Sequence, residues 1–131
     1  MQSSTKKIML IDDNGIDLKI NSKLINIAKL FDEIIMFHSA IEALDYFGKY
    51  ADVPEMLPNF ILLDIQMPEM DGFDFLERYK KLPKQITDKC PVAMLSSTLD
   101  FGDIKRAEAN AYVVKLLKKP LSVMELSKLL N

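Results

Sequence analysis

Carboxylates stand directly after two short apolar runs of this chain. KIMLI, residues 7–11, is followed by Asp12 and Asp13, and FILL, residues 60–63, is followed by Asp64. Carboxylate oxygens are ligands that Mg²⁺ accepts, and a carboxylate can also act as the nucleophile in phosphoryl transfer. Either chemistry requires a fold that brings the ends of the two runs together.

Other polar groups follow two later apolar runs. Ser96, Ser97 and Thr98 come after PVAML, and Lys119 comes two residues after YVVKLL. Hydroxyl and ammonium groups can hold phosphoryl oxygens, so these residues are candidates for the same site. Ser96 is preferred because it falls first after its run, whereas one of the three hydroxyl residues is expected to cap the following helix. Lys119, taken alone, would also fit a solvated surface lysine.

Five apolar runs alternate along the chain with segments of helical periodicity. The runs are rich in Ile, Val, Leu and Met and do not alternate with polar residues, which is typical of strands covered on both faces. They are residues 7–11, 33–37, 60–63, 91–95 and 112–117. The helical segments are residues 16–31, a helix opened by a capping box at Ser39, one capped by Asp71, a shorter one near 104–109, and one opened by a capping box at Ser122.

Strict alternation of strands and helices predicts an α/β fold of the doubly wound (βα)5 type. Right-handed crossovers place helices on both faces of a parallel sheet, and the flavodoxin-like strand order 2-1-3-4-5 is expected. Residues 1–131 are expected to form one domain with its core in residues 7–130 and no output domain. Four lysines, at positions 80, 81, 84 and 89, are predicted to flank a solvated surface loop.

The composition excludes several function classes. A net charge of −2 gives no general attraction to nucleic acid or anionic lipid, and no apolar run approaches the roughly 18 residues of a membrane span. A single cysteine, Cys90, cannot form an internal disulfide and fits a reducing compartment. A cytoplasmic protein that binds neither nucleic acid nor membrane is therefore expected.

The polar residues are expected to meet at one rim of the sheet, because ligands bind at the carboxyl ends of the strands in such folds. Unpaired carboxylates that crowd together repel one another, so this group requires a cation, and oxygen ligands suit Mg²⁺. Asp64 could then act as nucleophile and form an aspartyl phosphate. The backbone carbonyl of Gln66 can supply a further metal ligand, and Gly72 allows the next helix to begin without a side-chain clash.

Simpler interpretations exist for some of these residues. Asp12 and Asp13 could serve only as a turn and helix cap, since Asn14 and a glycine follow. His38 is interpreted as an edge-strand residue rather than a ligand. Cys90 is interpreted as an ordinary buried or half-buried residue at the start of a strand.

These motifs resemble the receiver domain of two-component response regulators from Lys7 to Leu130. The matching stretches are IDD at residues 11–13, LLDIQMPEMDGFDFL at 62–76, MLSS at 94–97 and KKP at 118–120. The stretch DIQMPEMDG is the most specific of them. The long, proline-containing loop before the third strand also occurs in some single-domain regulators.

The resemblance implies a role for each rim residue. Asp64 would be phosphorylated, and the direct Mg²⁺ ligands would be Asp13, Asp64 and the Gln66 carbonyl, with Asp12 acting through water. Ser96 would hold the phosphoryl group and Lys119 would pair with it. The family's Lys-Pro bond before Pro120 is usually cis.

One position departs from the family pattern. Members often carry an aromatic switch residue three places before the lysine, and Leu116 stands there in this chain. Tyr112 lies three residues before Lys115, but no proline follows Lys115, so Tyr112 is expected near the start of the fifth strand and far from the rim.

The leading hypothesis is a stand-alone phospho-acceptor signalling switch. A histidine kinase or histidine phosphotransfer protein would phosphorylate Asp64, and an unknown protein target would then bind the face made by the last two strand-helix units. The domain would catalyse only its own phosphorylation and dephosphorylation. One alternative is an unphosphorylated adaptor. A phosphatase with an aspartate nucleophile is disfavoured because Gln66 replaces the second acid, and a flavin carrier because acids follow the first strand.

Overall fold

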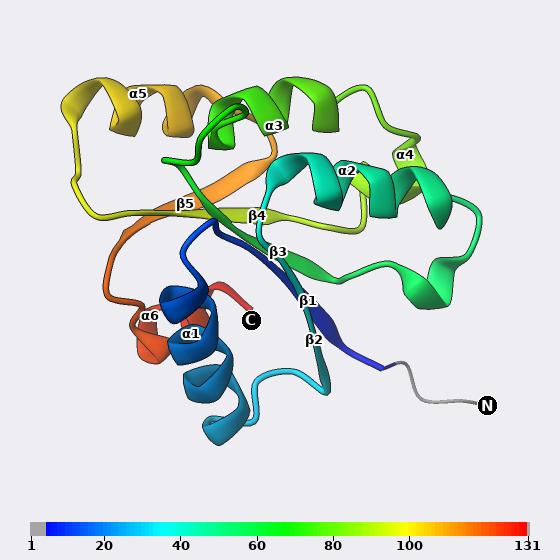
Figure 1. Ribbon diagram of the computed structural model, residues 1–131, viewed down its shortest axis with the longest axis horizontal. Helices are drawn as coiled ribbons and strands as arrows, with labels where there is room; N and C mark the ends of the chain where they lie inside the picture. The colour runs from blue at the N-terminus through cyan, green and yellow to red at the C-terminus, as the bar shows by residue number, and fades with distance from the viewer. Residues whose placement is uncertain (1–4, 131) are drawn as a thin grey trace.

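A five-stranded parallel sheet lies at the centre of the computed structural model, which describes residues 5–130 (Figure 1). The strands are β1 (Lys7–Ile11), β2 (Glu33–Phe37), β3 (Phe60–Asp64), β4 (Val92–Ser96) and β5 (Val113–Lys118). Their order is β2-β1-β3-β4-β5, and every neighbouring pair is parallel. The expected doubly wound, flavodoxin-like fold is thus confirmed. Residues 1–4 and 131 of the expected domain lie outside the described residues.

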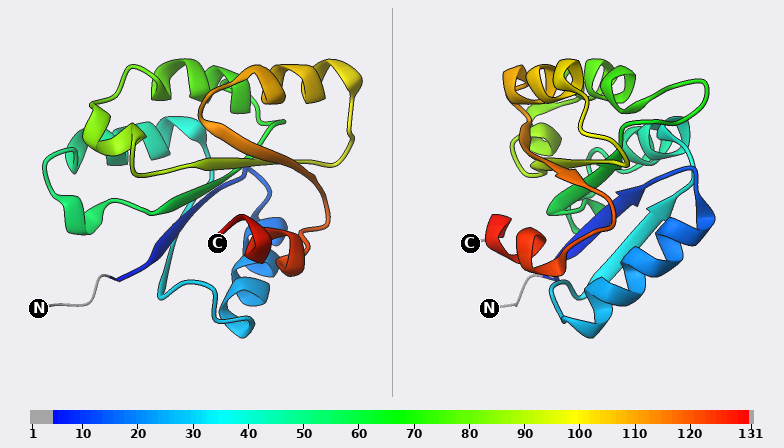
Figure 2. Two further views of the ribbon diagram at one scale, coloured as in Figure 1. Left: turned by 180° about the vertical axis from the view of Figure 1, so that it is seen from behind. Right: turned by 90° about the vertical axis from the view of Figure 1, so that its left-hand side faces the viewer.

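Helices cover both faces of the sheet (Figures 1 and 2). α1 (Gly15–Ile27) and α6 (Val123–Leu129) lie on one face. The other face carries α2 (Ala40–Lys49), α3 (Gly72–Tyr79), α4 (Lys84–Thr87) and α5 (Phe101–Ala109). A single 3-10 turn, η1 (Pro54–Met56), lies in the loop before β3. Within residues 5–130, no helix has the length and apolar character that crossing a membrane requires.

Two hydrophobic cores lie on opposite sides of the sheet. Successive strand residues point to opposite faces, so Met9 and Ile11 of β1 pack into the core with α2, α3 and α5, whereas Leu10 packs into the core with α1 and α6. Every residue of β3 and β4 is buried. This burial on both faces explains why the strand runs are continuously apolar.

Side-chain caps fix where the helices begin. Ser39 accepts a hydrogen bond from the Glu42 N–H and Ser122 accepts one from the Glu125 N–H, as expected of the first halves of capping boxes. A full capping box at Ser39 would also have the Ser39 N–H donate to the Glu42 carboxylate. That expectation is wrong, because the Glu42 carboxylate accepts from the His38 N–H instead. A complete capping box forms at α3, between Asp71 and the third residue of that helix.

The structure also corrects the boundaries of three strands and one loop. β3 and β4 each end one residue later than their apolar runs, at Asp64 and Ser96, and β4 also begins one residue later, at Val92. β5 begins after Tyr112 rather than at it. The expected lysine-flanked loop contains the short helix α4, which buries Ile86 against the core.

Candidate functional site

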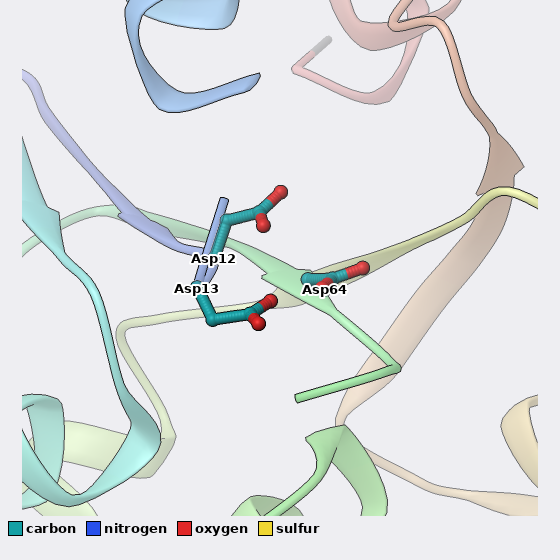
Figure 3. Close-up of side chains that lie close together, drawn as sticks. All are labelled: Asp12, Asp13 and Asp64. Carbon is teal, nitrogen blue, oxygen red and sulfur yellow. The ribbon is translucent and has the colours of Figure 1, made fainter. Parts of the chain in front are cut away.

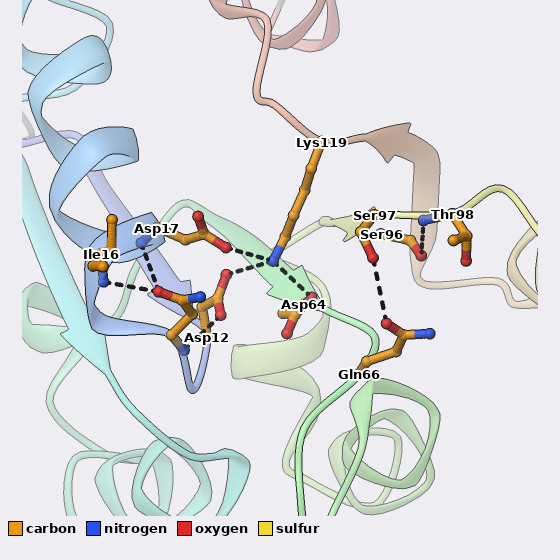
Figure 4. Close-up of polar contacts among 10 residues, drawn as sticks. Asp12, Ile16, Asp17, Asp64, Gln66, Ser96, Ser97, Thr98 and Lys119 are labelled. Carbon is orange, nitrogen blue, oxygen red and sulfur yellow. Dashed lines mark hydrogen bonds and ion pairs between the residues drawn. The ribbon is translucent and has the colours of Figure 1, made fainter.

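The candidate site lies at the carboxyl ends of four strands. Asp12 follows β1, Asp64 ends β3, Ser96 ends β4, and Lys119 follows β5. Figure 4 shows these side chains gathered above the same edge of the sheet. The expected convergence at one rim is therefore observed.

Three carboxylates at this rim form a compact group. One oxygen from each of Asp12, Asp13 and Asp64 lies within 4.8 Å of the others (Figure 3). Asp12 is 3% and Asp64 is 4% exposed, whereas Asp13 lies open to solvent. Oxygen ligands at this spacing, with one open side that can keep water, have the character of a magnesium site.

The turn after β1 orients Asp12. The Asp12 N–H donates to the carbonyl of Phe37, and its Oδ1 accepts from the Asn14 N–H at 2.9 Å. Asn14, rather than either aspartate, caps α1, because its Oδ1 accepts from the N–H groups of Ile16 and Asp17. Asp12 therefore takes part in a turn, as the simpler interpretation held, and this turn directs its other oxygen toward the rim.

Close backbone packing fixes Asp64. The N–H of the next residue, Ile65, donates to the carbonyl of Leu95 at 2.9 Å, which continues the pairing with β4. The Gly72 N–H then donates to the Ile65 carbonyl at 2.8 Å. A Cβ atom at Gly72 would lie 2.7 Å from the Asp64 carbonyl oxygen and 2.9 Å from Met94 Cε. Gly72 is thus required by its approach to the backbone of Asp64, as expected.

Lys119 pairs with three carboxylates. Its Nζ lies 2.9 Å from Asp17 Oδ2, 3.1 Å from Asp12 Oδ2 and 3.2 Å from Asp64 Oδ1. The backbone N–H of Lys119 donates to the backbone carbonyl of Ser96 at 2.8 Å, which places Lys119 beside β4. The Lys119-Pro120 bond is cis. Lys119 is therefore not a solvated surface lysine.

Asp17 is the one member of this network that the sequence analysis missed. It is the third residue of α1, where an acid is favourable simply because it lies near the positive end of the helix dipole. Its only sequence signal was its position shortly after Asp12 and Asp13, in the first helical turn beside the rim.

The electrostatics of the rim favour a bound cation. Burial, together with the charge of Asp12, raises the pKa of Asp64 to about 6, although the Lys119 ammonium opposes this shift. Burial alone would lower the pKa of Lys119, but hydrogen bonds to Asp17 and Asp12 and the charge of Asp64 raise it above its ordinary value. The lysine therefore stays charged at neutral pH, and a divalent ion would relieve the remaining carboxylate repulsion.

The hydroxyl residues after β4 differ in position. Ser96 is fully buried, and its Oγ accepts from the Thr98 N–H at 3.2 Å. Ser97 is exposed, and its Oγ lies 3.5 Å from the side-chain oxygen of Gln66. The expectation that one of them caps the next helix is wrong, because Asp100 caps α5. The metal-binding role expected of the Gln66 carbonyl stays a prediction.

The remaining candidates lie apart from the acid group. Leu116 is half-buried and lines a groove of about 550 Å³ between β5 and α5. The ring of Tyr112 packs edge-on against Tyr79 at 5.6 Å, at the opposite end of β5 from Lys119, as expected. His38 is exposed just after the edge strand β2. Cys90 is buried, where its Sγ donates to the Pro58 carbonyl.

Fold and geometry together define a doubly wound α/β protein whose strand ends carry a group of three carboxylates with a lysine beside it. The family model of the response regulator receiver domain matches residues 8–131. The chain therefore belongs to the response regulator receiver domain family of two-component signalling.

Solved structures and curated relatives agree with this assignment. A response regulator receiver protein from Dyadobacter fermentans is 35% identical with a TM-score of 0.85, over 95% of this chain and 94% of that one. A two-component response regulator from Cytophaga hutchinsonii is 29% identical with a TM-score of 0.90, over 98% and 96%. The polar-differentiation response regulator DivK of Brucella ovis is 30% identical over 91% of this chain and 88% of its own length. The chain spans 76% of one curated relative's length and 13% of another's.

Proposed function

We propose that this protein is a phospho-acceptor switch in which Asp64 receives a phosphoryl group in the presence of Mg²⁺. The single observation that carries the proposal is the position of Asp64. It ends a fully buried strand, shares an acid group with Asp12 and Asp13, and lies 3.2 Å from a lysine ammonium. A buried strand-end carboxylate, beside a lysine ammonium and within a group of acids that could hold Mg²⁺, meets the main requirements of phosphoryl transfer, which are positioning and charge neutralisation.

Each residue of the rim has a role in this reaction. An Asp64 oxygen attacks the phosphorus of a phosphohistidine, the P–N bond breaks, and an aspartyl phosphate forms while the nitrogen keeps the bonding pair. Asp13, Asp64 and the Gln66 carbonyl would hold Mg²⁺, and Asp12 would bind it through water. When bound, Mg²⁺ neutralises the charge on the phosphoryl oxygens. Lys119 pairs with one of these oxygens, and Ser96 donates a hydrogen bond to another.

The phosphoryl donor would be a histidine kinase or a histidine phosphotransfer protein. Phosphorylation would shift the domain toward a state that an as yet unknown protein target binds through the face formed by α5, β5 and α6. In this proposal residues 1–131 act as one receiver domain. The domain transfers phosphate only to and from itself, and it acts in the cytoplasm, where the buried free thiol of Cys90 stays reduced.

Leu116 favours a second candidate, a receiver-fold adaptor that acts without phosphorylation. An aromatic side chain at this position usually couples the phosphoryl site to the output face in the family that the chain resembles, and Leu116 has no ring to provide that coupling. Asp12, Asp13, Asp64, Ser96 and Lys119 are all placed at the rim, and this argues for the phospho-acceptor.

Thermal unfolding with a phosphoryl mimic separates the two candidates. Beryllofluoride binds a carboxylate in place of a phosphoryl group, so a phospho-acceptor gains stability when Mg²⁺ and beryllofluoride are added together. The melting temperature should rise further than with Mg²⁺ alone, and this further rise should vanish in Asp64→Asn. If neither Mg²⁺ nor beryllofluoride changes the melting temperature of the wild type, the adaptor is favoured.

A further inference from the structure

The shortest ion pair of the Lys119 ammonium is with a residue that has no part in the proposed reaction. The ammonium lies 2.9 Å from Asp17, closer than to Asp12 or Asp64. The Asp17 side chain is 32% exposed and the Lys119 side chain 19% exposed, so water screens the pair only in part. The pair joins the first turn of α1 to the segment after β5.

Asp17 stands outside the group of acids that could hold a cation. That group consists of Asp12, Asp13 and Asp64. In the view of Figure 4, Asp17 and Ser96 lie on opposite sides of the Lys119 ammonium, and Asp64 lies below it. Asp17 therefore attracts the ammonium away from the side on which Ser96 would hold a phosphoryl group.

The Lys119 ammonium donates hydrogen bonds to Asp17 and Asp12 and forms an ion pair with Asp64. A phosphoryl group on Asp64 would bring new oxygens that require a donor. Attraction to these oxygens would draw the ammonium toward Asp64 and away from carboxylates on its other side. Asp12 and Asp64 stay beside the phosphoryl group and the cation, so the contact with Asp17 is the one to weaken.

We propose that Asp17 competes with the phosphoryl group for Lys119 and so lowers the affinity of the site for that group. This inference rests on the proposed function and assigns to Asp17 a positioning role that acts through the lysine. Removing the negative charge of Asp17 frees the ammonium to turn toward the phosphoryl oxygens. The substitution also removes the ion pair that joins α1 to the segment after β5. Phosphorylation would weaken the same ion pair, because it draws the ammonium away from Asp17.

The chain offers a matched control for Asp17. Asp103 is likewise the third residue of its helix, α5, and carries the same charge near the same helix end. Among the described residues, the carboxylates that pair with Lys119 are those of Asp12, Asp17 and Asp64. Asp17→Asn and Asp103→Asn therefore make the same change of charge and of helix-dipole interaction, but only Asp17→Asn releases the lysine.

The test is a beryllofluoride titration of the full chain at saturating Mg²⁺. The rise in melting temperature is measured at each beryllofluoride concentration and reports binding. Asp17→Asn should lower the half-saturating beryllofluoride concentration by about threefold to tenfold, the range expected for a partly buried charged hydrogen bond. Asp103→Asn should leave it within about twofold, as expected for a screened charge. The melting temperature of Asp17→Asn without ligand should fall, because an ion pair is lost.

Binding and stability thus move in opposite directions, which a merely structural role of Asp17 would not produce. Asp17→Ser gives the same sign and replaces Asp17→Asn if the latter fails to fold. An unchanged or weaker response of the folded Asp17 variants, or an equal gain in Asp103→Asn, overturns the inference while leaving the proposed function intact. A wild-type protein that does not respond to beryllofluoride overturns both.

Discussion

The ammonium of Lys119 lies 3.2 Å from Oδ1 of Asp64, although the two residues come from different strand ends. The same ammonium also contacts Asp12, a member of the acid group around Asp64. A lysine in this position can neutralise carboxylates and later bind phosphoryl oxygens, but it also competes with a metal ion for the same carboxylates.

Replacing Lys119 by methionine should change metal and phosphoryl binding in opposite directions. The variant loses the cation that competes with Mg²⁺, so the Mg²⁺ dissociation constant should fall about threefold or more. Beryllofluoride should bind more weakly, because a charged donor to its fluorine atoms is gone. Titration calorimetry measures both quantities. Lys118→Met, a change at the exposed neighbouring residue, is the control and should alter neither, whereas equal effects in the two variants would argue against the role of Lys119.

The raised pKa of Asp64 should make the protein's stability depend on pH when a chelator removes divalent ions. The folded-state pKa is about 6 against an ordinary value of 3.8, mainly because of burial, so folding favours the neutral acid. This stabilisation is fully present below about pH 4 and is lost as the pH rises through about 6. Above pH 7, Asp64→Asn should therefore be more stable than the wild type, by about 1–3 kcal/mol in denaturant unfolding.

Saturating Mg²⁺ should reverse this order, since only the wild type gains the full metal contact. Urea unfolding at pH 5 and pH 7.5, each with chelator or with Mg²⁺, measures all four conditions. A less stable Asp64→Asn protein at pH 7.5 in chelator would show that burial of the ionised carboxylate carries no net cost.

Gly72→Ala should destabilise the fold and weaken the site. The new methyl group would lie 2.7 Å from the Asp64 carbonyl oxygen, so the backbone that carries Asp64 must shift. We expect a loss of about 1–3 kcal/mol in the free energy of unfolding and weaker Mg²⁺ binding. Gly48→Ala is the control. Gly48 lies in α2, and a methyl group there would meet no neighbouring atom within 4 Å. That variant should gain about 0.5–1 kcal/mol and bind Mg²⁺ as the wild type does.

The two serines at the end of β4 should differ in function. Ser96 is fully buried at the strand end beside Asp64, whereas Ser97 is exposed and faces Gln66. Ser96→Ala should weaken beryllofluoride binding about tenfold, because a hydrogen bond to a charged group is lost. Ser97→Ala should change it by less than about twofold. A larger effect in Ser97→Ala would show that Ser97, and not Ser96, provides the hydroxyl that binds the phosphoryl group.

Sequence patterns were sufficient to predict the fold and the positions of most residues at the rim. β1 and β2 have the bounds that their apolar runs indicate, because polar or turn residues flank both runs. β3 and β4 extend onto Asp64 and Ser96, since backbone pairing in a parallel ladder does not require an apolar side chain. The rule that ligands bind at carboxyl strand ends then placed the candidate residues correctly.

Other features depend on contacts that no local pattern encodes. α4 is four residues long, too short to show helical periodicity, and buried Ile86 anchors it to the core. Asp17 has the pattern of an ordinary acid at a helix start, and its contact with Lys119 depends on where the segment after β5 lies. Asp100 takes the capping role expected of a hydroxyl residue because α5 begins at Phe101, directly after Asp100 and before the expected start near residue 104.

Intact-mass spectrometry after incubation with a small-molecule phosphodonor tests the site most directly. Wild-type protein with Mg²⁺ should gain the mass of one phosphoryl group, and the gain should disappear with chelator, with Asp64→Asn, or after hydroxylamine, which cleaves acyl phosphates. Asp13→Asn should reduce it, because Mg²⁺ would lose a ligand. No added mass on folded wild-type protein, or an equal addition to Asp64→Asn, would contradict the assignment of Asp64 as the phosphate acceptor.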